Sequence, residues 1–373
     1  TRRSGAVRIE VFAASYAEAR ERFLAAAHGS AAQTESHTHP LAGPAGEALA
    51  IDVARFGPAD APAALWFSSG THGIEGFCGS AAQTAAIAAG SFDTLPPGVA
   101  AIVVHAINPW GFAWQRRVNE DNVDMNRNFV DHDAPYPANP VYDTLHDALC
   151  PQTWDEATRH RTAEAMAAAG ERFGEREALE GTSRGQYDHA DGLFYGGRAP
   201  TWSNRTVARI AAERLGKARF VASLDMHTGL GPHGHGEAIA TTGNPEALAI
   251  LERWYGDAIR LPGAGAVSGT VTGVLSDGIA RNTDALVLPV ALEFGTVPRA
   301  EVRLALRADA WLHAHGDPLS DGAAAIKRQI RAAFYPETPT WKRAVLERTE
   351  AILALMLGGL GRLAEARSDS SAT

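Results

Sequence analysis

The chain has 373 residues, of which 45% are apolar and 21% charged, so it can bury a large core and is not a disordered protein. Its formal net charge of −9 argues against a polyanionic partner such as nucleic acid. The two cysteines, Cys78 and Cys150, are too few for a disulfide framework or a cysteine-based zinc site.

Short apolar runs rich in β-branched residues alternate along the chain with alanine-rich amphipathic stretches. The expected strands are Ala48–Ala54, Ala63–Ser68, Ala101–Ala106, Phe220–Leu224 and Ala285–Leu292. The expected helices are Ser15–Ala27, Ser80–Ala89, Ala163–Arg172, Arg205–Leu215, Pro245–Trp254, Ala300–His315, Asp321–Phe334 and Trp341–Leu357. This alternation predicts an α/β protein whose helices are layered on a sheet.

Residues 135–202 differ from the rest because they are rich in Pro, Asn, Tyr and charged side chains. We interpret them as a long insertion with some helix that runs over the edge of the sheet, and as a candidate lid. Residues 1–363 are expected to form one domain, followed by a disordered tail at 364–373. No uncharged apolar stretch approaches about 18 residues, and no signal peptide is recognisable, so we expect a cytoplasmic protein without membrane contact.

The first candidate site is the sequence Ser-Ser-Gly-Thr-His-Gly-Ile-Glu-Gly, which begins at the end of the expected strand Ala63–Ser68. Ligands bind at the carboxyl ends of strands in open α/β sheets, so His72 and Glu75 lie where a site is expected. An imidazole and a carboxylate three residues apart can reach one Zn²⁺ ion. The alternative is a helix N-terminus with a capping Glu75 and a surface His72.

The second candidate is His227, which follows the expected strand Phe220–Leu224 and precedes a glycine-rich turn. Together with His72 and Glu75 it would supply three protein ligands and leave one open position, as in catalytic zinc sites. The alternative is a core histidine whose hydrogen bonds are satisfied by Asp225.

The third candidate is Glu293, which ends an apolar run that starts at Val287. Burial on one side raises the pKa of a carboxyl group, and such a group beside an activated water is a good general base. The alternative is a buried glutamate paired with an arginine.

The fourth candidate is the polar loop that follows the expected strand Ala101–Ala106. Arginine combined with asparagine can bind a carboxylate, and Asp124 could hold a metal-ligating histidine through its second nitrogen. The arginines and asparagines of this loop are Asn108, Arg116, Arg117, Asn119, Asn122, Asn126, Arg127 and Asn128. The alternative is an ordinary polar loop.

Taken in chain order, these residues resemble the M14 family of zinc carboxypeptidases, the funnelins, and most closely a bacterial M14-like branch known as DUF2817. The resemblance covers about Tyr16 to Phe334 and includes the segments S-G-T-H-G-x-E-G-F, N-V-D-x-N-R-N-F and D-x-H-T-G-L-G-P. One departure is Trp110, which stands where the family has an aspartate. The resemblance implies a three-layer α/β/α sandwich on a mixed, mostly eight-stranded sheet.

The resemblance also implies a role for each residue of the candidate site. His72, Glu75 and His227 would hold one Zn²⁺ ion, and Asp124 would orient the first histidine. The remaining implied roles are polarisation of the scissile carbonyl by Arg117, binding of the substrate's terminal carboxylate by Asn126 and Arg127, and general base and acid catalysis by Glu293.

The implied activity is hydrolysis of an amide or peptide bond by zinc-activated water, with a small peptide or an N-acylated amino acid as substrate. Two alternatives are an N-acyl amino acid deacylase similar to aspartoacylase and succinylglutamate desuccinylase, and a catalytically silent zinc-binding protein. The family also places a tyrosine over the substrate, for which Tyr187 and Tyr195 are candidates, with packing aromatics as the alternative. His233 and His235 are alternative metal ligands or loop residues, and Cys78 is expected to be a buried residue at a helix start.

Overall fold

The computed structural model describes residues 9–262, 266–269 and 271–366. Its strands are β1 (Gln33–Ala42), β2 (Ala48–Phe56), β3 (Ala63–Ser68), β4 (Val99–His105), β5 (Phe220–His233), β6 (Gly236–Ala240), β7 (Ile259–Arg260) and β8 (Leu286–Gly295). Its α-helices are α1 (Tyr16–His28), α2 (Gly76–Ala88), α3 (Pro109–Ala113), α4 (Met125–Asn128), α5 (Pro140–Leu149), α6 (Glu156–Phe173), α7 (Glu175–Gly181), α8 (Trp202–Leu215), α9 (Pro245–Tyr255), α10 (Leu275–Ala280), α11 (Arg299–His315), α12 (Ala324–Phe334) and α13 (Pro339–Glu365). Short 3-10 turns are η1 (Ile9–Val11), η2 (Gly73–Glu75), η3 (Gly256–Ala258) and η4 (Asp321–Ala323).

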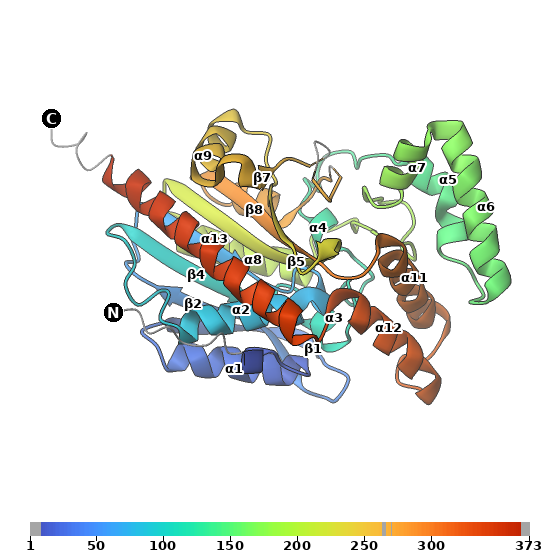
Figure 1. Cartoon of the computed structure of the whole chain (residues 1–373), viewed down its shortest axis with the longest axis horizontal. Coiled ribbons are helices and arrows are strands. Elements are labelled where there is room, and N and C mark those ends of the chain that lie inside the picture. The colour runs from blue at the N-terminus through green and yellow to red at the C-terminus, as the bar shows by residue number, and fades with distance from the viewer. Residues whose placement is uncertain (1–8, 263–265, 270, 367–373) are drawn as a thin grey trace.

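The strands form one eight-stranded mixed sheet in the order β1-β2-β4-β3-β5-β8-β6-β7 (Figure 1). The four central strands β4, β3, β5 and β8 are parallel to one another. Strand β2 is antiparallel to β4 on one side, and β6 is antiparallel to β8 on the other. Because parallel strands are covered on both faces, their sequences are nearly continuous apolar runs, as in Ala63–Ser68.

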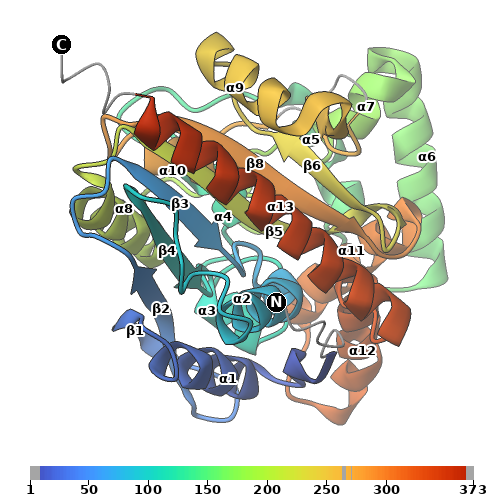
Figure 2. The ribbon, with the colours of Figure 1, turned by 60° about the vertical axis from the view of Figure 1, so that its left-hand side comes forward.

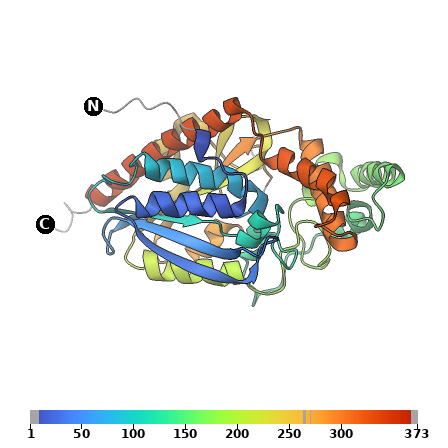
Figure 3. The same cartoon turned by 90° about the horizontal axis from the view of Figure 1, so that it is seen from below.

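Helices cover both faces of this sheet (Figure 3). Helices α1, α2 and α13 lie on one face, and α8 lies on the other. Successive side chains of a strand point to opposite faces, so Leu65 and Phe67 of β3 join the first core while Trp66 joins the second. The expected three-layer α/β/α sandwich on an eight-stranded mixed sheet is therefore confirmed.

The parallel strands carry their functional side chains to one end of the sheet. Ser68, at the end of β3, is the register partner of Asp225 in β5. Further along β5, His227 is the register partner of Glu293 in β8. Partners on neighbouring strands are separated by about 5 Å, so the sheet alone brings two of the candidate residues side by side.

Residues 135–202 form a helical unit, α5 to α7, that has its own small apolar core and lies beside α11 (Figure 2). Arg307 of α11 donates a hydrogen bond to the Leu149 carbonyl at 3.0 Å. The segment does not run over the edge of the sheet, as the sequence led us to expect; it contacts the loop after β4, at the carboxyl end of the central strands. There, Asn122 Nδ2 donates to the Gly192 carbonyl at 2.9 Å.

The five expected strands are present, but β1, β6 and β7 were not expected. Strand β1 is a largely exposed edge strand and β7 has only two residues, so neither has an apolar pattern. Helix α13 continues to Glu365, which corrects the expected start of a disordered tail at residue 364, and residues 367–373 lie outside the described residues. Among the described residues, no helix is both long and apolar enough to cross a membrane.

Candidate metal centre and active site

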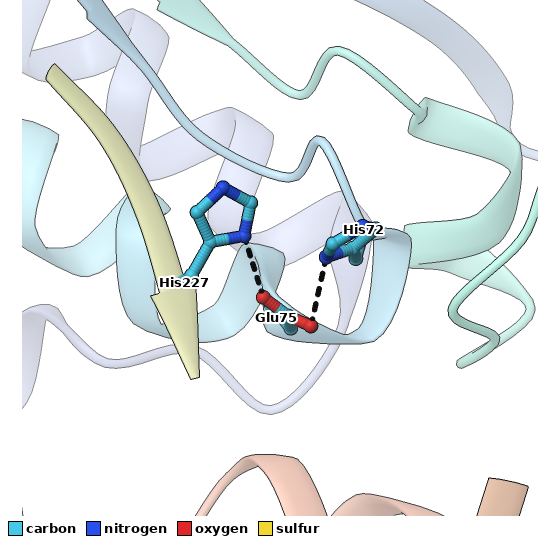
Figure 4. A group of neighbouring side chains, drawn as sticks. All are labelled: His72, Glu75 and His227. Atoms are coloured by element: carbon cyan, nitrogen blue, oxygen red, sulfur yellow. Dashed lines mark hydrogen bonds and ion pairs between the residues drawn. The ribbon is translucent and has the colours of Figure 1, made fainter. Parts of the chain in front are cut away.

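Three side chains converge just beyond the end of β3, beside the middle of β5 (Figure 4). His72 lies in the turn after β3, Glu75 in η2, and His227 in β5. His72 Nδ1 is 3.0 Å from Glu75 Oε1, and His227 Nδ1 is 3.1 Å from Glu75 Oε2. The three side chains are buried, and one potential ligand atom from each lies within 4.8 Å of the others. The first two candidate segments therefore meet at one point.

Each imidazole is held from behind by a buried aspartate. His72 Nε2 lies 3.1 Å from Asp124 Oδ1, and His227 Nε2 lies 2.7 Å from Asp225 Oδ2. An imidazole that donates its Nε2 proton to a carboxylate presents the lone pair of Nδ1 on its opposite side. Both histidines thus turn Nδ1 toward the same carboxylate, that of Glu75.

This donor set fits a divalent cation. Metal binding requires neutral imidazoles, and rings whose Nε2 protons point to the aspartates would present two Nδ1 lone pairs beside the Glu75 carboxylate. A cation satisfies all three, and two nitrogens with one carboxylate match the protein ligands of catalytic Zn²⁺ sites. Ligand atoms bound to one zinc ion at about 2 Å lie roughly 3 to 4 Å apart, close to the separations found here.

The turn that carries two of these residues can form because glycines let it approach another loop. A Cβ atom on Gly73 would lie 2.1 Å from the Gly111 carbonyl carbon, and one on Gly76 would lie 2.5 Å from the Phe112 ring. The close approach also lets the Gly73 amide donate a hydrogen bond to the Arg117 carbonyl at 3.1 Å. The glycines of the first candidate segment thus fit it against the Asn-Pro-Trp-Gly loop.

The Asn-Pro-Trp-Gly loop keeps its turn despite its tryptophan. Asn108 Oδ1 accepts a hydrogen bond from the Gly111 amide at 2.8 Å and caps α3. Trp110 stacks on Trp114 with ring centroids 5.3 Å apart. The tryptophan therefore packs locally on the turn and leaves the cap intact.

Glu293 lies beside the metal-facing residues on the adjacent strand β8. One carboxylate oxygen, Oε1, accepts a hydrogen bond from the Leu230 amide at 2.9 Å. Burial, followed by the negative charge of Glu75, raises the pKa of Glu293 to about 7. The alternative of a glutamate paired with an arginine is not observed, because no arginine among the described residues forms an ion pair with it.

Arg117 bridges two of the acidic side chains. Its Nε donates to Asp124 Oδ2 at 3.0 Å, and its Nη1 donates to Glu75 Oε1 at 3.1 Å. Its Nη2 also lies 2.8 Å from His72 Nε2. Burial opposes ionisation of Asp124, but the charges of Arg117 and His72 outweigh it and hold the pKa of Asp124 well below its usual range.

Asn126 and Arg127 lie next to the metal-facing residues but are held mainly by the protein itself. Asn126 Nδ2 is 3.3 Å from His227 Nε2, and its Oδ1 accepts from the Leu275 amide at 2.8 Å. Arg127 donates to the Asn126 and Ser183 carbonyls at 2.8 and 2.6 Å, while its buried Nε has no partner. Arg127 therefore makes no ion pair among the described residues, and its charge remains available to an anion.

The two candidate tyrosines support the loop that carries Arg127. Tyr187 is buried and donates its hydroxyl proton to the Arg127 carbonyl at 2.7 Å. The Tyr195 carbonyl accepts from the Asp124 amide at 2.8 Å. In this structure Tyr187 packs on the loop, as in the alternative considered from the sequence, and its hydroxyl is engaged by the Arg127 carbonyl.

Phe194 is the aromatic side chain that faces the two arginines. Its ring centroid lies 5.3 Å from Arg117 Cζ and 5.7 Å from Arg127 Cζ. Sequence reasoning missed Phe194, whose backbone has a left-handed φ of 54° in an irregular loop. No local pattern marks such a residue.

The sequence indicates Asp225 only as an alternative partner for His227, yet in the structure it contacts His227 on the side opposite Glu75. Ser68 and Thr71 each donate to its Oδ1 at 2.8 Å. The sequence does contain a signal, because residues two apart on a strand share a face, so Asp-Met-His in β5 places both side chains together.

The remaining candidates lie away from the site. His233, the last residue of β5, and His235, in the turn that follows, are exposed and do not belong to the cluster of potential metal ligands. Cys78 is buried near the start of α2, as expected, and burial raises the pKa of its thiol well above the usual value.

Comparison with known proteins places the chain in a family. Residues 12–348 match the family model described as "Protein of unknown function (DUF2817)", so the chain belongs to this family, and the resemblance to DUF2817 seen in the sequence is confirmed. No curated protein matches the chain.

The solved structures to which the chain is similar include carboxypeptidase A from Helicoverpa armigera, with 15% identity and a TM-score of 0.45, covering 91% of this chain and 73% of that one. Succinylglutamate desuccinylase from Chromobacterium violaceum has 18% identity and a TM-score of 0.32, covering 80% of this chain and 74% of that one. The murein-tripeptide amidase from Escherichia coli O157 has 14% identity and a TM-score of 0.38, covering 79% and 97%.

Proposed function

We propose that this chain is a zinc-dependent hydrolase that cleaves an amide bond next to a free carboxylate on the leaving side. The observation that carries the proposal is the convergence of His72, Glu75 and His227, with Glu293 directly beside them on the neighbouring strand. A zinc ion held by these ligands would act as a Lewis acid toward the amide carbonyl and would acidify a water molecule.

The residues around the ligands have the chemistry that such a reaction requires. Glu293, whose carboxylate is buried on the strand next to His227, can accept a proton from the attacking water and later give it to the leaving amine. Arg117 lies on the same side of the site as Glu75 and can stabilise the negative charge that develops on the carbonyl oxygen. In this reaction one C–N bond breaks and one C–O bond forms; water supplies the hydroxyl group of the new acid and the one proton that the leaving amine takes up.

The carboxylate of the substrate would bind at Arg127. This guanidinium is 5% exposed, forms no ion pair among the described residues, and keeps one N–H without a partner. A bound carboxylate would compensate that charge and would fix the distance between the amide and the general base. Both a peptide with a free C-terminus and an N-acylated amino acid have this carboxylate.

The proposal is tested by zinc analysis together with the activity of Glu293→Gln. We expect about one zinc ion per chain, and a loss of at least about a hundredfold in kcat with zinc content unchanged. Glu252→Gln, an exposed position on α9, is the matched control and should retain activity. Full activity of Glu293→Gln, or absence of zinc in an active protein, would refute the mechanism.

The substrates to compare are peptides with a free C-terminus, the same peptides with an amidated C-terminus, and N-acyl amino acids. Cleavage of the free but not the amidated peptides supports the proposed role of Arg127. A preference for N-acyl amino acids over every peptide would make the chain a deacylase, and inactivity of the zinc-loaded protein toward all three classes would support a catalytically silent zinc protein.

A further inference from the structure

A cavity of about 420 Å³ lies between α6, the irregular loop before α8, and α11. This volume is within the range of small-molecule sites. Most of its lining is apolar, with side chains that include Leu193, Phe194 and Leu304. Its charged lining residues are all arginines, namely Arg159, Arg299, Arg303 and Arg307.

Within the part of the chain that the structure describes, the four arginines have no acidic partner. No carboxylate lines the cavity, and none of the four guanidinium groups forms an ion pair among the described residues. Arg303 donates only a long hydrogen bond of 3.4 Å to the Leu179 carbonyl. Arg307, which is 8% exposed, donates to the Leu149 carbonyl at 3.0 Å and to Thr162 Oγ1 at 2.6 Å.

This arrangement is unfavourable for the isolated protein. Arg299, Arg303 and Arg307 are spaced four residues apart on α11, where like charges destabilise a helix. Burial, followed by the charge of Arg299, lowers the pKa of Arg303. Burial also lowers the pKa of Arg307, to which Arg159 adds its repulsion. An anion in the cavity would relieve both the repulsion and the lack of partners.

The cavity adjoins the proposed carboxylate site. Phe194 lines the cavity, and the same ring lies 5.3 Å from Arg117 Cζ and 5.7 Å from Arg127 Cζ. Thr182 also lines it, and the next residue, Ser183, accepts the hydrogen bond from Arg127. A molecule bound at Arg127 therefore has the cavity directly beside it.

We propose that this arginine-lined cavity receives a second carboxylate of the substrate, carried on a short apolar chain next to the carboxylate that binds Arg127. The substrate class is then an amide whose leaving part is an acidic amino acid or another dicarboxylate. The apolar lining accommodates the methylene groups, and Arg303 and Arg159 bind the second carboxylate. This inference rests on the proposed function for the reaction, but the cavity itself can be tested by binding alone.

The test compares two probes that differ by one charge, N-acetyl-L-glutamate and N-acetyl-L-glutamine. Their binding to the full-length, zinc-loaded Glu293→Gln protein is measured by titration calorimetry, so turnover does not interfere. We expect the acidic probe to bind at least about tenfold more tightly, as one charged hydrogen bond implies. Equal affinity of the two probes, or binding of neither, would overturn the proposal.

Variants locate the preference within the protein. Arg303→Gln should reduce the ratio of the two affinities to about one, and Arg159→Gln should reduce this ratio several-fold. Because Arg159 is exposed, its variant keeps the test informative if Arg303→Gln fails to fold. Arg253→Gln, which removes the same charge from the exposed surface of α9, should keep the wild-type preference. A preference that survives in both cavity variants would overturn the assignment.

Failure of this inference differs from failure of the proposed function. A wild-type chain that cleaves amides of glutamate and glutamine equally well remains a hydrolase but has no acidic subsite. A chain that binds the acidic probe through Arg303 but hydrolyses no amide has the subsite without the proposed reaction.

Discussion

Replacing Asp225 with asparagine should weaken metal binding without removing a metal ligand. Asp225 Oδ1 accepts hydrogen bonds from both Ser68 and Thr71 at 2.8 Å, while Oδ2 lies 2.7 Å from His227 Nε2. An asparagine that keeps its oxygen toward the two hydroxyls must turn its NH2 group toward the histidine. The Nε2 atom would then have to accept a hydrogen bond, and the proton would move to Nδ1, the atom that faces Glu75.

The magnitude follows from these contacts. Either His227 adopts the tautomer that cannot ligate, or the amide turns over and loses its hydrogen bonds to the hydroxyls. A hydrogen bond to a charged group contributes about 1.5 to 3 kcal/mol, which corresponds to roughly a 10- to 100-fold loss of zinc affinity. Because the side chains have almost the same volume, the fold itself should be retained.

The assay is competition for zinc between the protein and a chelator of known affinity. The control is Asp52→Asn. Asp52 is another buried aspartate, which forms an ion pair with Arg20 at 2.7 Å. It lies on β2, which β4 and β3 separate from β5. This control should lower the free energy of unfolding and leave zinc affinity at the wild-type value. Wild-type zinc affinity in Asp225→Asn would refute the reasoning about the tautomer.

Three further predictions concern stability. Burial lowers the pKa of His105 to about 4, so the unfolded chain binds a proton more readily than the folded chain. The free energy of unfolding should therefore fall by up to about 3 kcal/mol as the pH drops from about 6.5 to 4. Urea unfolding of His105→Gln should lack this part of the pH dependence, whereas His160→Gln, at an exposed site, should keep it. Gly73→Ala should lower the free energy of unfolding by more than about 2 kcal/mol, because its Cβ would lie 2.1 Å from backbone, whereas Gly243→Ala meets no atom within 4 Å and should melt like the wild type. Removing metal with a chelator should lower the melting temperature, since an ion at 100 times its Kd adds about 2.7 kcal/mol, and an unchanged melting curve would contradict a site formed only by the native fold.

The positions of the candidate residues could be predicted because each follows an apolar run. In a parallel sheet the carboxyl ends of such runs share one edge, so His72, His227 and Glu293 were expected to meet. The roles of their neighbours were less accessible. From the sequence, Asp225 is a partner that would account for His227 without a metal, whereas the structure shows that Asp225 and Glu75 contact opposite sides of the same ring.

Other features depend on packing between distant elements. The arginine-lined cavity forms only because α6 lies beside α11, which brings Arg159 near Arg307, and no periodicity in either helix indicates that contact. In the sequence, Tyr187 is a candidate because it is an aromatic residue near a glycine-rich loop. In the structure its hydroxyl donates a hydrogen bond to the Arg127 carbonyl. Composition can identify an irregular segment as functional, while the direction of each side chain depends on the tertiary fold.

The order of the strands in the sheet constrains when the site can exist during synthesis. The strands β1 to β4 emerge first, yet β5, which sits between β3 and β8, follows only after the helical unit of residues 135–202. His227 is separated from Glu75 by 152 residues, and Glu293 emerges later still. A nascent chain that ends before β5 has two of the three metal-facing side chains and an uncovered edge on β3. Metal capture should therefore coincide with insertion of β5, which makes the ion a reporter of the step that covers the free edge of β3.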